Sequence, residues 1–193
     1  MGTYIPFGTD GEKLRERIDS QREGKIVGLT GGTFDLFHDG HVFFLAQCRK
    51  KCDILVVDVT NDERVRLRKG PDRPALSANK RAGVVASNQY VDYTTIVRST
   101  EEEELLESFN PTVRLAKIIR PEVIIQEDGR WTPKYVNEVV DFLGYNPDLI
   151  SIKDRSLRGK GYQTSTTGLM EKIRNSRPEE TRFSFGSRTR IAD

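Results

Sequence analysis

The sequence predicts an α/β domain with a Rossmann-like, doubly wound parallel sheet, because short apolar strands alternate with amphipathic helices along the chain. The clearest strand is 53–59, a nearly continuous apolar run typical of a strand buried on both faces of a parallel sheet. An earlier strand at 25–29 is expected to break at the pair Gly31 and Gly32. The length of 193 residues suits one domain with a substantial core.

Helices are predicted where apolar residues recur at helical spacing. The first covers 12–21, where Leu14 and Ile18 are four residues apart, and Gly24 stands in the position of a C-cap. Ser77 is an N-cap candidate for a helix over 78–89. The remaining helices are expected at 41–51, 102–109, 134–142 and 167–175.

Further strands are predicted at 93–97, 123–126 and 149–152, whereas the polar, Arg-, Gly- and Pro-rich stretch 61–76 predicts a long loop. We therefore divide the chain into an N-terminal extension (1–24), a single core domain (25–175) and a C-terminal tail (176–193). The tail carries four Arg and three acidic residues with little apolar content, so we expect it to be mobile or to form an arm across a partner.

Composition argues against several classes of partner. The 31 basic and 29 acidic residues nearly balance, whereas a nucleic-acid-binding domain usually has a basic excess. No apolar run approaches the roughly 18 residues that a membrane span needs, and the first ten residues do not resemble a secretory signal. The two cysteines, Cys48 and Cys52, provide neither a disulfide framework nor a zinc site. We expect a cytoplasmic protein without nucleic-acid or membrane partners.

The first strand-to-helix turn, residues 31–41, concentrates the features of a phosphate site. In open parallel sheets, ligands bind beyond the carboxyl ends of the strands. Glycine lets the backbone approach a phosphate, and the amino end of the following helix offers free N–H groups and a partial positive charge. The chain's only two histidines, His38 and His41, lie three apart in this turn. The turn therefore predicts a polyphosphate site.

The histidines also have two plainer interpretations. They can cap the helix, or they can bind a metal, but no Cys/His cluster supplies the further ligands that zinc requires. The turn also lacks the Lys-Ser/Thr ending of a P-loop, which excludes a Walker-type site.

Residues 31–41, GGTFDLFHDGH, resemble the GTFDxxHxGH signature of the cytidylyltransferase-like nucleotidyltransferases. Within that family the chain is most similar to ADP-heptose synthase-type sugar-phosphate adenylyltransferases, and then to glycerol-3-phosphate cytidylyltransferase. The resemblance covers about 24–174 and includes further motifs at 44–50, 60–62, 68–81, 91–92 and 165–167. It departs at Cys52-Asp53, at Glu127-Asp128-Gly129 and in a longer segment at 153–163, which bear on base and acceptor specificity.

The resemblance implies a reaction in which an acceptor phosphate attacks the α-phosphorus of a nucleoside triphosphate and pyrophosphate leaves. That acceptor is already anionic near pH 7, since its second pKa is about 6, so stabilisation of charge matters more than a strong base. The implied catalytic residues are His38, His41 and Lys69. The implied nucleotide ligands are Gly32, Thr33, Phe34, His38, His41, Arg81, Asp128, Ser165, Thr166 and Thr167, and the acceptor-phosphate residues are Asp62, Lys69 and Arg73.

Mg²⁺ is expected to bind through the triphosphate without a dedicated protein site, and a homodimer is implied by resemblance. The favoured function is transfer of AMP or CMP to a sugar or polyol phosphate, with ATP preferred on the likeness around residues 69–74. The alternatives are a glycerol-3-phosphate cytidylyltransferase, a flavin mononucleotide adenylyltransferase and a non-catalytic nucleotide-binding module.

Overall fold

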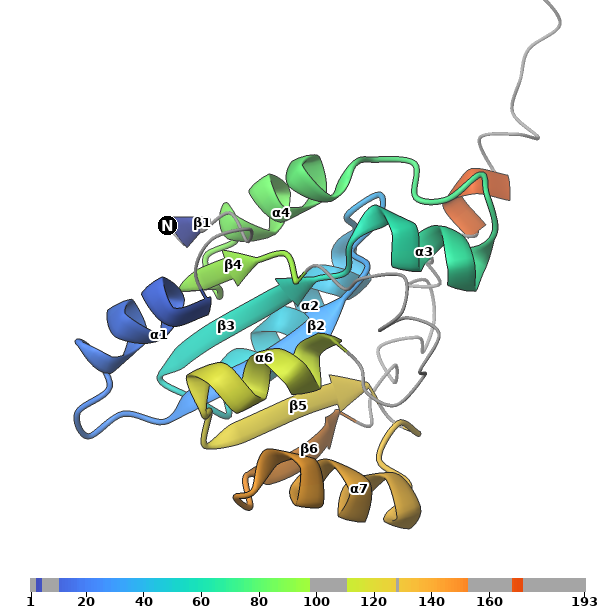
Figure 1. Cartoon of the computed structure of the whole chain (residues 1–193). Coiled ribbons are helices and arrows are strands. Elements are labelled where there is room, and N and C mark those ends of the chain that lie inside the picture. The colour runs from blue at the N-terminus through green and yellow to red at the C-terminus, as the bar shows by residue number, and fades with distance from the viewer. Residues whose placement is uncertain (1–2, 5–10, 98–110, 128, 153–167, 172–193) are drawn as a thin grey trace, which may run out of the picture.

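A computed structural model describes residues 3–4, 11–97, 111–127, 129–152 and 168–171. Its strands form a six-stranded parallel sheet in the order β1-β4-β3-β2-β5-β6 (Figure 1). The strands are β1 Thr3–Tyr4, β2 Val27–Gly32, β3 Ile54–Val59, β4 Tyr93–Thr95, β5 Val123–Glu127 and β6 Asp148–Ile152. The predicted doubly wound parallel α/β fold is confirmed.

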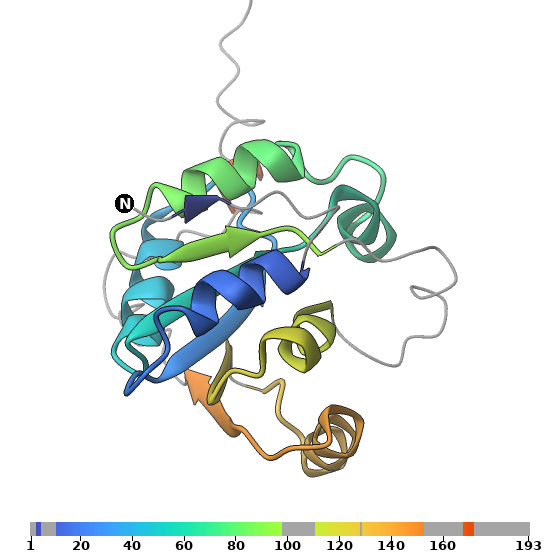
Figure 2. The same cartoon turned by 60° about the vertical axis from the view of Figure 1, so that its left-hand side comes forward.

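Helices cover both faces of this sheet (Figures 1 and 2). On one face, α1 (Gly11–Asp19), α6 (Pro111–Ile119) and α7 (Pro133–Leu143) pack on a cluster that includes Leu29, Val56 and Ile124. On the other, α2 (Asp39–Arg49) and α4 (Ala78–Ala86) pack on a cluster that includes Leu55, Val57 and Ile125. All six residues of the central strand β3 are buried.

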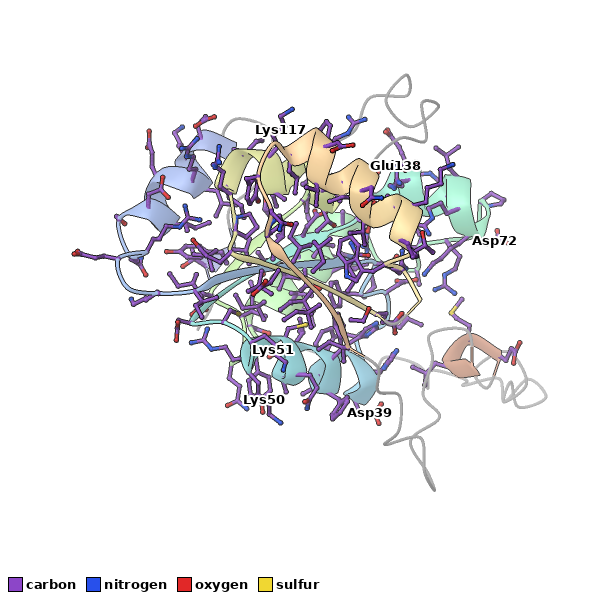
Figure 3. The ribbon with its side chains drawn as sticks, turned by 90° about the horizontal axis from the view of Figure 1, so that it is seen from below. Asp39, Lys50, Lys51, Asp72, Lys117 and Glu138 are labelled. Atoms are coloured by element: carbon purple, nitrogen blue, oxygen red, sulfur yellow. The ribbon has the colours of Figure 1, made fainter. Side chains whose placement is uncertain are left out.

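The strand order reverses beside β2, and this reversal positions the site. From β2 the chain continues to β3 and β4 on one side, whereas β5 and β6 lie on the other. The helix that follows β2 and the helix that follows β5 consequently cover opposite faces. Figure 3 shows this separation, with Lys50, just after α2, below the sheet and Glu138 of α7 above it. A crevice at such a switch point is where doubly wound folds bind ligands.

Strand β2 does not break at the glycine pair as the sequence predicted. Gly31 and Gly32 continue the strand and pair with Asp58 and Val59 of β3. A Cβ at Gly31 would lie 2.0 Å from the side-chain oxygen of Thr112, so the glycine allows α6 to approach the sheet closely. Tertiary pairing and packing thus override the low strand propensity of glycine.

The predicted loop over 61–76 is also wrong in part, because it contains helix α3, Asp62–Lys69. Asn61 caps this helix by accepting a hydrogen bond of 2.8 Å from the backbone N–H of Arg64. Of its eight residues only Val65 is buried, so the helix shows no apolar stripe that sequence periodicity could detect. Helix α6 was missed as well, and the helix expected at 102–109 lies outside the described residues.

Several predicted caps need revision. Helix α1 ends at Asp19, and Gly24, with φ of +67°, lies in the turn before β2. Ser77 occupies the N-cap position of α4 without a capping side-chain bond. The described residues 168–171 are helical, within the helix predicted at 167–175. In the described parts of the chain, no helix has the length and apolar character of a membrane span.

Candidate active site

The two histidines form a reciprocal cap at the start of α2. Nδ1 of His38, the N-cap residue, accepts from the N–H of Gly40 at 3.1 Å, and Nδ1 of His41 accepts from the N–H of His38 at 3.3 Å. The histidines thus do cap the helix, as one of the plainer interpretations held. This capping leaves phosphate binding open, because it uses only the Nδ1 atom of each ring. Because each neutral ring accepts through Nδ1, its proton resides on Nε2, which remains a donor.

Aromatic packing holds both imidazoles in place. The rings of His38 and His41 stack with their centroids 3.8 Å apart, and Phe34 and Phe37 lie 5.3 and 5.4 Å from His41. Burial, followed by the neighbouring charges of His38 and Lys69, lowers the pKa of His41 to about 3. Burial also lowers the pKa of His38, although Asp39 opposes this effect. Both side chains are therefore neutral hydrogen-bond donors at neutral pH.

The turn between β2 and α2 has an unusual backbone. Phe34 and Leu36 adopt positive φ values of 50° and 47°, a left-handed conformation that is rare for residues with a Cβ. Phe34 is buried, and a Cβ at Gly32 would lie 3.0 Å from its ring. Left-handed residues in such turns build the concave amide surfaces that bind anions, which suits the predicted role of Gly32, Thr33 and Phe34.

Asp35 fixes this turn to the segment that follows α3. Its carboxylate, 1% exposed, accepts from the N–H groups of Ala75 and Leu76 at 3.0 to 3.2 Å. It also receives Nε of Arg73 at 3.1 Å, and the same arginine's NH2 lies at the same distance. The sequence analysis missed Asp35. An acidic residue in a turn expected to bind an anion is unusual, and it could have indicated that a basic side chain pairs with it there. Arg73, predicted as an acceptor ligand, is held in this ion pair.

Arg81, which the resemblance implied to be a phosphate ligand, is surrounded by protein acceptors in the structure. Its fully buried guanidinium donates to the carbonyls of Leu76, Thr33 and Thr60 and to the carboxylate of Asp62, the last at 2.6 Å. It thereby connects the ends of β2 and β3 with the start of α3. These contacts favour a positioning role for Arg81. Asp62, predicted on the acceptor side, is the counter-charge of Arg81 in the structure.

Lys69, at the last residue of α3, is brought close to the histidines. Its positive charge contributes to the lowered pKa of His41. The pKa of Lys69 is itself lowered, first by desolvation and then by the charges of Arg73 and Arg68, whereas Asp35 raises it. The charge of Lys69 therefore acts on the histidine pair at the carboxyl edge of the sheet, and the catalytic roles of His38, His41 and Lys69 stay predictions. Asp128, Ser165, Thr166 and Thr167 lie outside the described residues, and their roles stay predictions.

A buried carboxylate lies on β3 behind the turn between β2 and α2. Asp58 of β3, 1% exposed, accepts from the N–H of Val97 at 3.1 Å and from the hydroxyl of Thr112 at 2.9 Å. Burial raises the pKa of Asp58 to about 6, although these two hydrogen bonds and the charge of Arg64 oppose the rise. The folded protein therefore holds a proton on Asp58 at a pH where the unfolded chain has released it.

We expect Asp58→Asn to stabilise the protein above pH 6 and to have little effect near pH 4. Between the unfolded pKa of 3.8 and the folded value of about 6, the folded state binds more protons, so the wild type's free energy of unfolding falls as pH rises. The pKa difference corresponds to about 3 kcal/mol. An asparagine keeps an acceptor for Val97 and does not ionise.

Urea unfolding of the wild type and of Asp58→Asn at pH 4 and pH 7 measures this effect, with the exposed Asp141→Asn as control. A stability difference that does not grow with pH would contradict the assignment.

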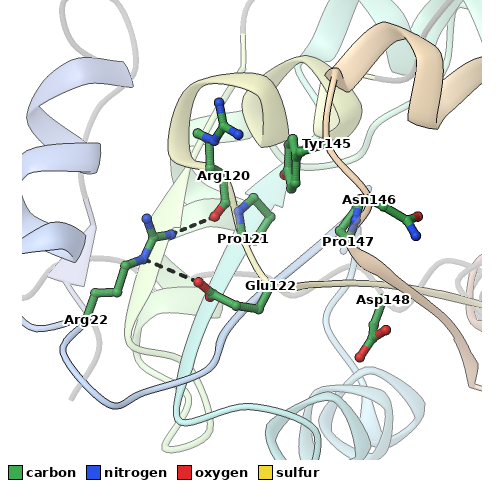
Figure 4. A pocket seen from close by; sticks show the side chains of 8 residues that line it. All are labelled: Arg22, Arg120, Pro121, Glu122, Tyr145, Asn146, Pro147 and Asp148. Carbon is green, nitrogen blue, oxygen red and sulfur yellow. Dashed lines mark hydrogen bonds and ion pairs between the residues drawn. The ribbon is translucent and has the colours of Figure 1, made fainter.

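A cavity of about 460 Å³ lies at the opposite edge of the sheet, before the first residues of β5 and β6 (Figure 4). There NH2 of Arg22 donates to the carbonyl of Arg120 at 2.8 Å, and its Nε lies 3.8 Å from Glu122. Arg22 thus closes the carboxyl end of α6. This cavity is separate from the histidines, because it lies before the amino ends of β5 and β6, whereas α2 begins beyond the carboxyl end of β2, which runs parallel to them.

The family model described as cytidylyltransferase-like matches residues 29–169. The chain belongs to the cytidylyltransferase-like family. The resemblance drawn from residues 31–41 is confirmed, and with it the assignment to the nucleotidyltransferases.

Curated relatives place this family domain within longer proteins. This chain is 32% identical over 169 residues to the bifunctional protein HldE of Desulfatibacillum aliphaticivorans, an alignment that covers 86% of this chain and 31% of the relative. It is 36% identical over 168 residues to bifunctional protein HldE of Bradyrhizobium sp. (strain ORS 278), covering 86% of this chain and 30% of the relative. The chain thus spans about a third of the length of these relatives.

Solved structures show the same fold. A lipopolysaccharide core biosynthesis protein from Thermoplasma volcanium GSS1 superposes with a TM-score of 0.54 at 22% identity, covering 69% of this chain and all of that one. The pantoate-beta-alanine ligase from Francisella tularensis also gives a TM-score of 0.54, at 13% identity, covering 90% of this chain and 78% of that one. At these identities the comparison supports the architecture alone.

Proposed function

We propose that this domain transfers AMP or CMP from a nucleoside triphosphate to a sugar or polyol phosphate and releases pyrophosphate, with an ADP-heptose synthase-like adenylyl transfer favoured. The observation that carries the proposal is the pair of neutral imidazoles, His38 and His41, stacked at the amino end of α2 with Lys69 nearby. The relatives named HldE, 32% to 36% identical over most of this chain, support the sugar-phosphate branch.

The proposed mechanism needs charge stabilisation more than proton abstraction. An oxygen of the acceptor phosphate forms a bond to the α-phosphorus as the bond to the bridging oxygen breaks, and pyrophosphate takes the electron pair. Nε2–H of His38 and of His41 donates to oxygens whose charge grows during this step. With a pKa of about 3, His41 is neutral at pH 7 and acts as a fixed dipole instead of as an acid. Lys69 reduces the repulsion between the two reacting anions.

Mg²⁺ is proposed to arrive on the triphosphate. Within the described ranges, no group of three or more His, Cys, Asp or Glu side chains could hold a metal ion. The triphosphate oxygens and water are hard ligands that suit Mg²⁺. When bound there, the ion would offset charge on the departing pyrophosphate, while the chain's own residues orient the α-phosphate.

A homodimer is also proposed, by family resemblance, without a nucleic-acid partner. Light scattering coupled to size-exclusion chromatography measures the mass of the protein in solution, and a monomer mass at micromolar concentration would contradict the dimer.

Pyrophosphate release tests the function. ATP and CTP, each with Mg²⁺, are crossed with sugar 1-phosphates (including a heptose 1-phosphate), glycerol 3-phosphate and flavin mononucleotide. We expect release with a sugar phosphate and ATP, and only when both are present. Glycerol 3-phosphate with CTP, or flavin mononucleotide with ATP, would redirect the assignment within the family. Tight nucleotide binding without release for any acceptor would identify a binding module and refute the transfer reaction.

A further inference from the structure

The short loop between β5 and α7 presents an arginine that the sequence motifs do not include. Gly129, with φ of +84°, turns the chain after β5, and Arg130 follows it with an exposed side chain. The next two residues anchor the loop. Trp131 donates its indole N–H to the carbonyl of Ile150 at 3.1 Å, and the side chain of Thr132 caps α7. Arg130 therefore projects from a loop whose base is held to β6 and α7.

The sheet order brings this loop to the phosphate turn. Strand β5 is the direct neighbour of β2 and runs parallel to it, with Gly28 opposite Val123 and Thr30 opposite Ile125. The loops that follow the two strands consequently emerge at the same edge, on either side of the switch point. Helix α3 borders that edge as well, since only two residues separate the end of β3 from its start.

Arg130 and Lys69 form an unusual pair of like charges. The positive charge of Arg130 is one of those that lower the pKa of Lys69. Arg73 is neutralised by buried Asp35, whereas Arg130 has no hydrogen-bond or ion-pair partner for its side chain in the described ranges. Cations that border the same sheet edge from different elements repel, and an anion bound between them removes the repulsion. The arrangement points to a ligand with at least two negative charges.

We propose that Arg130 binds the phosphate of the acceptor, opposite Lys69, so that the β5–α7 loop and α3 hold the attacking group from two sides. This inference rests on the proposed function and specifies its acceptor site. Arginine's planar fork can donate to two phosphate oxygens at once and leave the third for attack. The acceptors it selects are phosphomonoesters, which carry two negative charges near pH 7, over the corresponding neutral alcohols.

Steady-state kinetics of Arg130→Gln test the proposal with ATP and the acceptor that gives pyrophosphate release. We expect the acceptor KM to rise about tenfold or more, the cost of one lost charged hydrogen bond, while the KM for ATP changes less than twofold. Arg130→Lys should recover part of the loss, because it keeps the charge without the fork. Arg17→Gln, an exposed arginine in the last turn of α1, is the matched control and should retain the wild-type acceptor KM.

A second measurement separates failure of this inference from failure of the proposed function. Calorimetric titration with inorganic phosphate, in the presence of a non-hydrolysable ATP analogue and Mg²⁺, reports on the acceptor site without turnover. Weaker phosphate binding in Arg130→Gln but not in Arg17→Gln supports the site even if no acceptor reacts, in which case the transfer reaction alone fails. Wild-type phosphate affinity and acceptor KM in Arg130→Gln would overturn the inference while leaving the proposed function intact.

Discussion

Replacing His41 with alanine is expected to lower kcat about 100-fold or more, because removal of one preorganised donor to a reacting anion costs that much in comparable sites. The imidazole donates through Nε2, since Nδ1 accepts from the N–H of His38. Its pKa of about 3 keeps it neutral throughout the physiological range. Turnover is measured by pyrophosphate release with saturating ATP and acceptor.

The exposed neighbour Val42→Ala is the matched control, because it lies in the same helical turn without a donor. Circular dichroism of both variants checks the fold, since His41 also contributes to the cap of α2. A helix cap contributes only about 1 kcal/mol, so both proteins should remain folded at 25 °C. A kcat for His41→Ala within a fewfold of the control would remove the imidazole from the mechanism.

Asp35→Ala is expected to destabilise the protein by roughly 3–5 kcal/mol, because it leaves the charge of Arg73 without its buried partner. It also deprives the N–H groups of Ala75 and Leu76 of their acceptor. Since those contacts hold the phosphate turn against the segment after α3, turnover should fall in the same variant. Urea unfolding and pyrophosphate release measure the two effects.

Two further variants make this prediction specific. The exposed Asp72→Ala removes a carboxylate from the adjoining loop (Figure 3) and should be nearly neutral. The double variant Asp35→Ala with Arg73→Ala should be less destabilised than Asp35→Ala alone, because no unpaired buried charge remains. If Asp35→Ala matches the Asp72 control in stability, the carboxylate does not hold the turn.

Local patterns in the sequence predicted the outline of this protein well. Buried strands such as β3 and β5 were recognised because continuous apolar runs have few other interpretations. The His38 and His41 turn was found because a short-range spacing places both rings on one helical turn, whatever the rest of the chain does. Lys69 was predicted from the family resemblance of residues 68–81, and in the structure its charge lowers the pKa of His41.

The tertiary structure alone decided the partners of the charged residues. In the sequence, three charged residues near the phosphate motif look alike: Arg81, Arg73 and Asp62. In the structure, Arg73 pairs with Asp35, and Arg81 pairs with Asp62. Those pairs join positions 19 to 38 residues apart, a separation that no periodicity encodes. Helix α3 was missed because it has one buried residue, Val65, and no apolar stripe. Arg130 was missed because strand order, which sequence does not display, brings its loop to the same sheet edge as the β2–α2 turn. Local residue patterns determine elements and turns, whereas the burial and pairing of charges depend on which distant segments the sheet brings together.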